Sequence, residues 1–196
     1  LSISGDCKSP GIYEVEWGLT IRELLDMVGA RDTLAVQVGG ASGQCLAESG
    51  FNRKLCYSDL ATGGSIIIFN KSRDIFSIVR NFLDFFIEES CGWCTPCRAG
   101  NVLLKKKFEK IVSGLGTAQD LAEIESWGKL IKSTSRCGLG QTSPNPILTS
   151  LTNFRELYER KINKETDFVS EFDLKRAVEE ACEVTGRKFQ EERQDA

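Results

Sequence analysis

The sequence has no histidine, no long run of apolar residues and little net charge. Histidine is a common zinc ligand, so its absence narrows the metals that the chain is expected to bind. No apolar stretch approaches the ~20 residues that span a bilayer, and direct membrane insertion is therefore not expected. A net charge of −3 gives no sign of a nucleic-acid partner. At 196 residues and 41% hydrophobic, the chain has the composition of a soluble globular protein of one or two domains.

The sequence also lacks a secretory signal and a dinucleotide-binding motif. It begins at Leu1 in a strand-like pattern, without the charged and apolar regions of a signal peptide. It is long enough to form a core without disulfides, so we expect a reducing, cytoplasmic setting. No strand is followed by GxGxxG and a helix. The glycine-rich runs at 39–43 and 114–116 are predicted to be turns rather than phosphate-binding loops.

What the sequence does contain is an unusual group of cysteines. Cys91, Cys94 and Cys97 are spaced by two residues, and Cys137 follows after 39 intervening residues. Three thiols at this spacing can point inward from one tight loop and occupy three corners of an iron–sulfur cube, while a fourth thiol from elsewhere binds the last iron. We predict that Cys91, Cys94, Cys97 and Cys137 bind a 4Fe-4S cluster.

Two other interpretations of these cysteines are weaker. Structural zinc prefers two separated pairs of ligands, often with histidine, and here a triplet precedes a single cysteine. Disulfides do not suit a reducing setting. The remaining thiols, which have no ligand spacing, are interpreted as apolar fillers or surface groups; they are Cys7, Cys45, Cys56 and Cys182.

The residues between the cysteines suggest an open loop. Pro96 is predicted to keep Thr95 out of helical geometry. Gly92 and Gly100 are expected where the backbone turns sharply or approaches sulfide closely. Arg98 either offsets the charge of four thiolates or is simply solvated, and the sequence favours neither.

The hydrophobic period divides the chain into an N-terminal strand-rich part and a helical part. Residues 1–72 contain strand-like runs at 2–4, 12–16, 34–38 and 65–69. Thr20 and Glu23 form a capping box at the start of one helix, and Gly29 ends it. A hairpin, a helix and further strands in this length predict a small β-grasp (ubiquitin-like) domain.

Apolar residues recur at helical spacing through 73–165. Helices are predicted from Asp74 towards Ser90, from Arg98 to Val112, after the cap Thr117, and from Pro144 or Pro146 through Tyr158. These four helices predict a bundle that carries the cluster at one end. Residues 166–196 are predicted to be a short helix and a polar tail. The fold class is therefore α+β, a β-grasp domain followed by a four-helix bundle.

The cysteine motif resembles a known family. The run from Glu89 to Arg98, with Gly100 and Cys137, closely resembles the cluster domain of the flavin- and NADH-binding subunit of respiratory complex I. Three upstream stretches are similar to the soluble-ligand-binding β-grasp domain of that family. They are residues 4–11, 38–40 and 63–65. Residues 137–146 look more like the diaphorase subunits of NAD-linked hydrogenases and formate dehydrogenases.

The resemblance implies a division of labour. In the family, FMN and NAD(H) bind a larger domain that precedes the β-grasp segment, so this chain is expected to be part of a longer polypeptide and not to bind FMN or NAD(H) itself. Its implied partners are that FMN/NAD-binding domain and the iron–sulfur subunits of the complex. The chain is then part of an oxidoreductase, without catalysing NADH oxidation alone.

Three functions are compatible with these features. The first is an electron relay between FMN and the clusters of partner subunits. The second is a β-grasp module that binds a ligand or partner, with a purely structural metal in the bundle. The third, radical or Lewis-acid chemistry at the cluster, is disfavoured because four thiolates leave no iron open to substrate.

Overall fold

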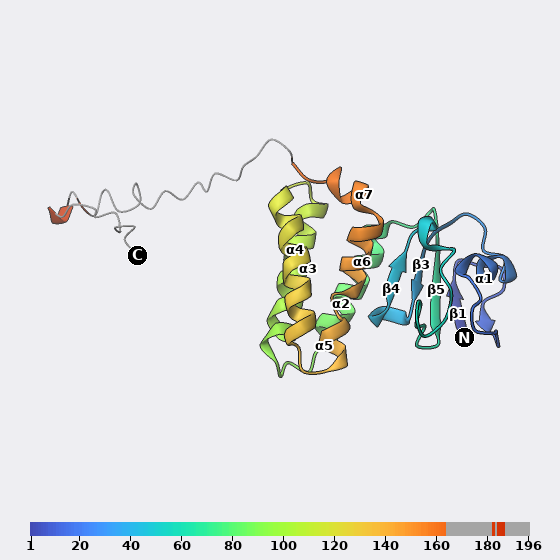
Figure 1. Ribbon diagram of the computed structural model, residues 1–196. Coiled ribbons are helices and arrows are strands. Elements are labelled where there is room, and N and C mark those ends of the chain that lie inside the picture. The colour runs from blue at the N-terminus through green and yellow to red at the C-terminus, as the bar shows by residue number, and fades with distance from the viewer. Residues whose placement is uncertain (164–181, 183, 187–196) are drawn as a thin grey trace. The chain divides into compact units, whose positions relative to one another are not determined.

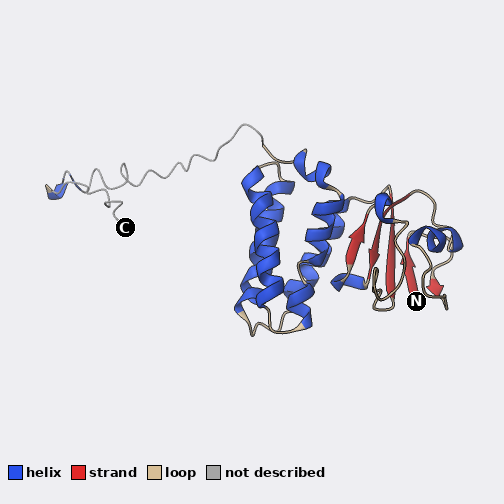
Figure 2. Ribbon diagram, viewed as in Figure 1, coloured by secondary structure: helices blue, strands red, loops and turns tan. Residues whose placement is uncertain are grey.

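A computed structural model describes residues 1–163, 182 and 184–186 of the chain. Residues 1–163 form one compact unit. Within this unit the strands precede the main helices, and the two kinds of element occupy different parts of it (Figure 2). This arrangement confirms the predicted α+β class. Of the predicted C-terminal helix and polar tail, only residues 182 and 184–186 are described, so that prediction lies otherwise outside the described residues.

The N-terminal part is a five-stranded mixed sheet with the order β2-β1-β5-β3-β4. Strands β1 and β5 run parallel, and the other neighbours are antiparallel. The strands are β1 (Ser2–Gly5), β2 (Gly11–Ile12), β3 (Thr33–Val38), β4 (Gln44–Leu46) and β5 (Ser65–Asn70). Strand β2 is shorter than the predicted run at 12–16, and β4 was not predicted. Two short 3-10 turns, Gly40–Ser42 and Glu48–Gly50, flank β4.

Helix α1 (Ile21–Met27) begins with the predicted capping box. The Thr20 side chain accepts the backbone N–H of Glu23, whose carboxylate accepts the backbone N–H of Thr20. The buried face of α1 packs against one face of the sheet, where side chains from β3 and β5 alternate inward. The β-grasp arrangement of sheet and helix therefore agrees with the prediction.

The opposite face of the sheet is also apolar. Ala35 and Cys45 are buried there among the helices of the second part, with Ile67 and Phe69 packed against them. Their neighbours Val36, Ile66 and Ile68 point to α1 instead. The sheet thus lies between α1 and the helical part (Figure 1). The sequence predicted a domain boundary at residue 72. In the structure the sheet and the helices share the core described above, so independent folding of the two parts stays a prediction.

The helical part contains four longer helices and two short ones. The longer helices are α2 (Ile75–Glu88), α3 (Thr95–Val112), α4 (Ala118–Thr134) and α6 (Asn145–Asn153); the short ones are α5 (Gly138–Thr142) and α7 (Arg155–Glu159). Helix α3 packs on α2 and α4, and α6 packs on α2 and α4, so the four longer helices form the predicted bundle. Asp74 caps α2, and a Thr117–Asp120 capping box begins α4.

Two helix boundaries differ from the sequence prediction. Helix α3 begins at Thr95 rather than Arg98, because Pro96 lies in its first turn, where no backbone N–H is needed. The prediction that Pro96 keeps Thr95 out of helical geometry is wrong. The predicted fourth helix is interrupted at Phe154, whose backbone leaves helical geometry with φ −125° and ψ 31°.

Helix α6 is hydrogen-bonded to the edge strand β4. Thr149 Oγ1 accepts the backbone N–H of Cys45 at 2.9 Å, and Asn153 Nδ2 donates to the Cys45 carbonyl at 2.7 Å. Asn145 Nδ2 donates to the Ser42 carbonyl at 2.7 Å. These bonds attach the bundle to the sheet. Among the described residues, no helix combines the length and apolarity needed to cross a membrane.

Candidate metal centre

The four candidate ligands come from two segments at one end of the bundle. Cys91 and Cys94 lie in the connection between α2 and α3, Cys97 is in the first turn of α3, and Cys137 directly precedes α5. Helix α5 contacts both α3 and α4. The turn between α2 and α3 and helix α5 are therefore at the same end of the helical part (Figure 1).

Cys94 lies where the two segments meet. The nearby backbone N–H groups of Arg136, the residue before Cys137, and of Cys97 lower the pKa of the Cys94 thiol. Cys94 is also the N-cap of the 18-residue helix α3, whose first N–H groups favour negative charge. The site is thus built to hold a thiolate at this position.

Cys97 is the buried member of the group, with a side chain surrounded by polar partners. Ser90 Oγ lies 3.4 Å from the Cys97 sulfur, and Asn101 Nδ2 donates to that sulfur at 3.5 Å. Ser143 Oγ donates to Asn101 Oδ1 at 2.8 Å. Asn101 and Ser143 are both fully buried. A polar chain therefore runs from the cysteine loop to the end of α5.

The other side of the site faces solvent. Cys91 and Cys137 are exposed, and the Trp93 side chain between the first two cysteines is 77% exposed. Gly92 turns the loop with φ +74°, as expected for a position that favours glycine. Arg98 Nη1 donates to the Gly92 carbonyl at 3.0 Å and so braces the loop.

Glycine at position 140 lets α5 approach the buried cysteine. A Cβ there would lie 2.7 Å from the Ser135 side chain and 3.1 Å from Cys97 Cβ. Gly100, in contrast, makes room for Ile131 of α4, so the expectation that it approaches sulfide is wrong. It serves helix packing inside α3.

The residues present fit an iron–sulfur cluster. Four thiols supply soft ligands, and the buried Ser135 hydroxyl, two residues before Cys137, has no hydrogen-bond partner within the described part of the chain. No three His, Cys, Asp or Glu side chains of the described residues converge on a position for a single metal ion. A cluster places its ligands at separate corners, so convergence on one point is not required.

Sequence reasoning missed the residues around the cysteines. Asn101, Ser135, Arg136 and Ser143 all lie at the site, although none belongs to the cysteine motif. Only Asn101 carried a signal in the sequence, because it follows Cys97 by four residues in a predicted helix and so shares its face.

Three of the remaining cysteines, Cys7, Cys45 and Cys56, belong to the N-terminal, sheet-containing part. Cys45 is buried between sheet and bundle, where burial raises its pKa to about 12, as expected for an unreactive filler. Cys7, Cys56 and Cys182 are partly buried. A Ser58 hydrogen bond lowers the pKa of the Cys56 thiol.

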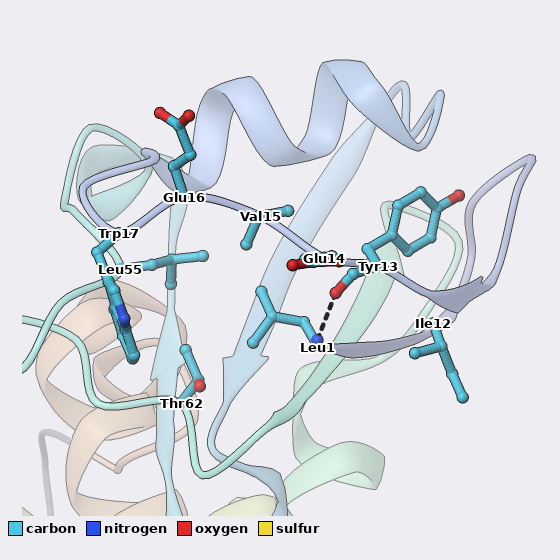
Figure 3. Close-up of a pocket in the computed structure, with 9 residues that line it drawn as sticks. All are labelled: Leu1, Ile12, Tyr13, Glu14, Val15, Glu16, Trp17, Leu55 and Thr62. Atoms are coloured by element: carbon cyan, nitrogen blue, oxygen red, sulfur yellow. Dashed lines mark hydrogen bonds between the residues drawn. The ribbon is translucent and has the colours of Figure 1, made fainter.

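The β-grasp part has an apolar groove of about 340 Å³ beside the N-terminus. Leu1, Val15, Trp17 and Leu55 are among its lining residues (Figure 3). The backbone amine of Leu1 donates to the Tyr13 carbonyl at its edge. Its lining also includes Tyr13, Glu14, Glu16 and Thr62.

Comparison with known proteins assigns the helical part. Residues 77–161, which include all four candidate ligands, match the family model described as the NADH-ubiquinone oxidoreductase-F iron–sulfur binding region. Residues 77–161 are therefore homologous to this iron–sulfur region. The family binds a 4Fe-4S cluster, in agreement with the cofactor predicted from the cysteine spacing.

Individual relatives extend the similarity over the sheet. The chain is 53% identical to the NAD-reducing hydrogenase HoxS subunit alpha of Cupriavidus necator over 91% of its length and 30% of the relative's. It is 34% identical to an NADH-quinone oxidoreductase subunit of Mycobacterium tuberculosis, covering 80% of this chain and 38% of the relative. The chain spans about a third of the length of these relatives.

A solved structure has the same fold. The crystal structure of an NAD⁺-reducing [NiFe]-hydrogenase in the H₂-reduced state superposes with a TM-score of 0.79 at 34% identity. The match covers 96% of this chain and 33% of the hydrogenase chain. This iron–sulfur region and its preceding sheet therefore correspond to part of a subunit of an oxidoreductase.

Proposed function

We propose that Cys91, Cys94, Cys97 and Cys137 bind the 4Fe-4S cluster and that the chain relays single electrons. The observation that carries the proposal is that the two cysteine segments meet at one end of the bundle, where α5, which directly follows Cys137, contacts α3, which directly follows Cys94. The match of residues 77–161 to an iron–sulfur binding region supports it independently.

Each protein group has a defined part in this function. The N-terminus of α3 and the two nearby backbone N–H groups stabilise a thiolate at Cys94. Burial of Cys97 excludes water from one side, whereas exposure of Cys91 and Cys137 leaves the other side open to a redox partner. When bound, a 4Fe-4S cluster takes up and releases one electron at a time.

The resemblance to the family supports a proposal for the donor and the acceptor. We propose that electrons pass between an FMN held by another part of the parent polypeptide, which also binds NAD(H), and iron–sulfur clusters of partner subunits. The relatives named as hydrogenase and quinone oxidoreductase subunits support such an assembly. We place it in the cytoplasm, where free thiols stay reduced.

The ligand assignment is tested by iron analysis of protein purified anaerobically. We expect about four irons and four sulfides per chain, and loss of most iron on Cys94→Ala, Cys97→Ala or Cys137→Ala. Cys56→Ala is the matched control, because it removes a thiol distant in sequence from the motif and should keep full iron content. Full iron content in the three ligand variants would refute the assignment.

Spectroscopy separates the relay from a structural metal. A reducible cluster gives an EPR signal at low temperature after dithionite is added. A colourless protein that contains zinc would instead favour a β-grasp binding module whose bundle is held together by metal.

A further inference from the structure

Asn101 and Ser143 form a fully buried polar pair beside Cys97. Burying amide and hydroxyl groups is unfavourable unless their hydrogen bonds are made. Here Ser143 Oγ donates to Asn101 Oδ1 at 2.8 Å and also lies 3.0 Å from the Gly140 carbonyl. Asn101 Nδ2 is directed at the Cys97 sulfur at 3.5 Å. The amide nitrogen of the pair is therefore hydrogen-bonded to the sulfur of a candidate ligand.

The pair fixes which end of the Asn101 amide faces sulfur. A metal-bound cysteine is a thiolate and has no proton to donate, so it needs a donor opposite it. Because this thiolate can only accept, the NH₂ group of Asn101 is the end that faces Cys97, and the Ser143 hydroxyl donates to Oδ1 on the other side of the amide. Helical spacing of four residues from Cys97 to Asn101 brings the two side chains together on α3.

We propose that Asn101, oriented by Ser143, donates a hydrogen bond to the Cys97 sulfur of the bound cluster and raises its reduction potential. The inference rests on the proposed assignment of Cys97 as a ligand. Reduction adds negative charge that the ligand sulfurs share, so a donor at sulfur stabilises the reduced form more than the oxidised form. The effect is strengthened because both side chains are removed from water.

Ser90 is a second donor on the same sulfur. Its Oγ lies 3.4 Å from the Cys97 sulfur and accepts the Gly92 N–H at 3.3 Å. Once Cys97 is a thiolate, it can only accept, so the Ser90 hydroxyl is the donor in the contact between these two side chains. Ser90 is partly exposed, so Asn101 is the buried and better insulated donor.

The test is a redox titration of the cluster-loaded chain, monitored by EPR. Asn101→Leu removes the donor at similar volume, and Ser143→Ala removes only the group that orients it. We expect the ratio of reduced to oxidised cluster at a fixed potential to fall by a factor of up to about ten in Asn101→Leu, because the shift is the part of the hydrogen bond's worth that differs between the two oxidation states. A tenfold fall corresponds to about 59 mV for a one-electron couple. Ser143→Ala should shift the ratio in the same direction by a smaller factor.

Ser150→Ala is the matched control. Ser150 is another fully buried serine, hydrogen-bonded to Tyr158 and the Ile147 carbonyl within the bundle, and its loss should leave the potential unchanged. Unchanged potentials in Asn101→Leu and Ser143→Ala, or loss of the cluster from Ser143→Ala, would assign the pair to folding and overturn the proposal. Iron content of the parent and the cysteine variants is measured separately, so failure of the ligand assignment is distinguished from failure of this inference.

Discussion

Asp120 is a carboxylate that the fold buries almost completely, with 2% of its side chain exposed. Burial alone would raise its pKa, but hydrogen bonds from Lys107 and Lys110 outweigh that effect and hold the pKa well below its ordinary value. The two Nζ atoms lie 2.6 and 2.7 Å from its oxygens, and the Thr117 N–H donates at 2.9 Å. One residue thus caps α4 and joins it to α3.

We predict that Asp120→Ala lowers the free energy of unfolding by about 3 kcal/mol, since it removes a buried carboxylate that pairs with two lysines and completes the capping box of α4. Because the folded-state pKa is depressed, this stabilisation is present above the unfolded-state pKa of about 4 and is lost as the pH falls below it. Urea unfolding at pH 7 and at pH 3 measures both effects.

Glu123→Gln serves as the control. Glu123 contacts the same Lys107 at 2.5 Å but is 27% exposed, so its loss should be much smaller. Equal losses for the two variants would contradict the importance of burial at Asp120.

At the scale of elements, the end of the β1–β5 ladder depends on close backbone contact. Gly5 pairs with Ile68 in the parallel register and has φ +95°. A Cβ at Gly5 would lie 2.1 Å from the Ile68 carbonyl oxygen. Gly64 also has a positive φ, +86°, yet a Cβ there would meet nothing within 4 Å.

These two glycines separate backbone strain from steric overlap. We predict that Gly64→Ala lowers the free energy of unfolding by about 1 kcal/mol through strain alone. Gly5→Ala should cost about 2 kcal/mol more, because the overlap forces β1 and β5 apart. Thermal or urea unfolding of both variants provides the comparison, and similar losses would show that the contact at Ile68 relaxes freely.

At the scale of the whole molecule, the two ends of the bundle are held differently. The sheet side is closed by apolar packing and by the bonds of Thr149 and Asn153 to Cys45. The cysteine end brings together segments 39 residues apart in sequence. Metal binding energy contributes directly to the folding of such a site.

We therefore predict that iron removal loosens only the cysteine end. Amide exchange should increase in the loop at 91–97 and in α5, whereas α1, β3 and β5 should keep their protection. Hydrogen–deuterium exchange of the loaded and iron-free protein measures this difference. The prediction fails if protection decreases equally throughout residues 1–163.

Much of the fold could be predicted because its signals are local. The Thr20–Glu23 capping box and the Thr117 cap start helices where the sequence placed them. Strand β4 and helix α5 were not predicted, because each is short and is stabilised by its neighbours rather than by its own sequence pattern. Strand β4 pairs with β3 and packs on α6. Helix α5 packs on α3 and α4. The prediction from Pro96 was wrong because a proline that precedes a helix and a proline in the first turn of a helix cannot be told apart in the sequence.

The sequence by itself determined the kind of chemistry, because the spacing of Cys91, Cys94 and Cys97 is a property of one short segment. Only the tertiary structure decided what surrounds those thiols. Helix α5 contacts α3, and the Ser143 hydroxyl donates to Asn101, although these segments are about 40 residues apart in the sequence. Such contacts depend on how α3, α4 and α5 pack, and side-chain packing between distant helices leaves no periodic pattern in the sequence.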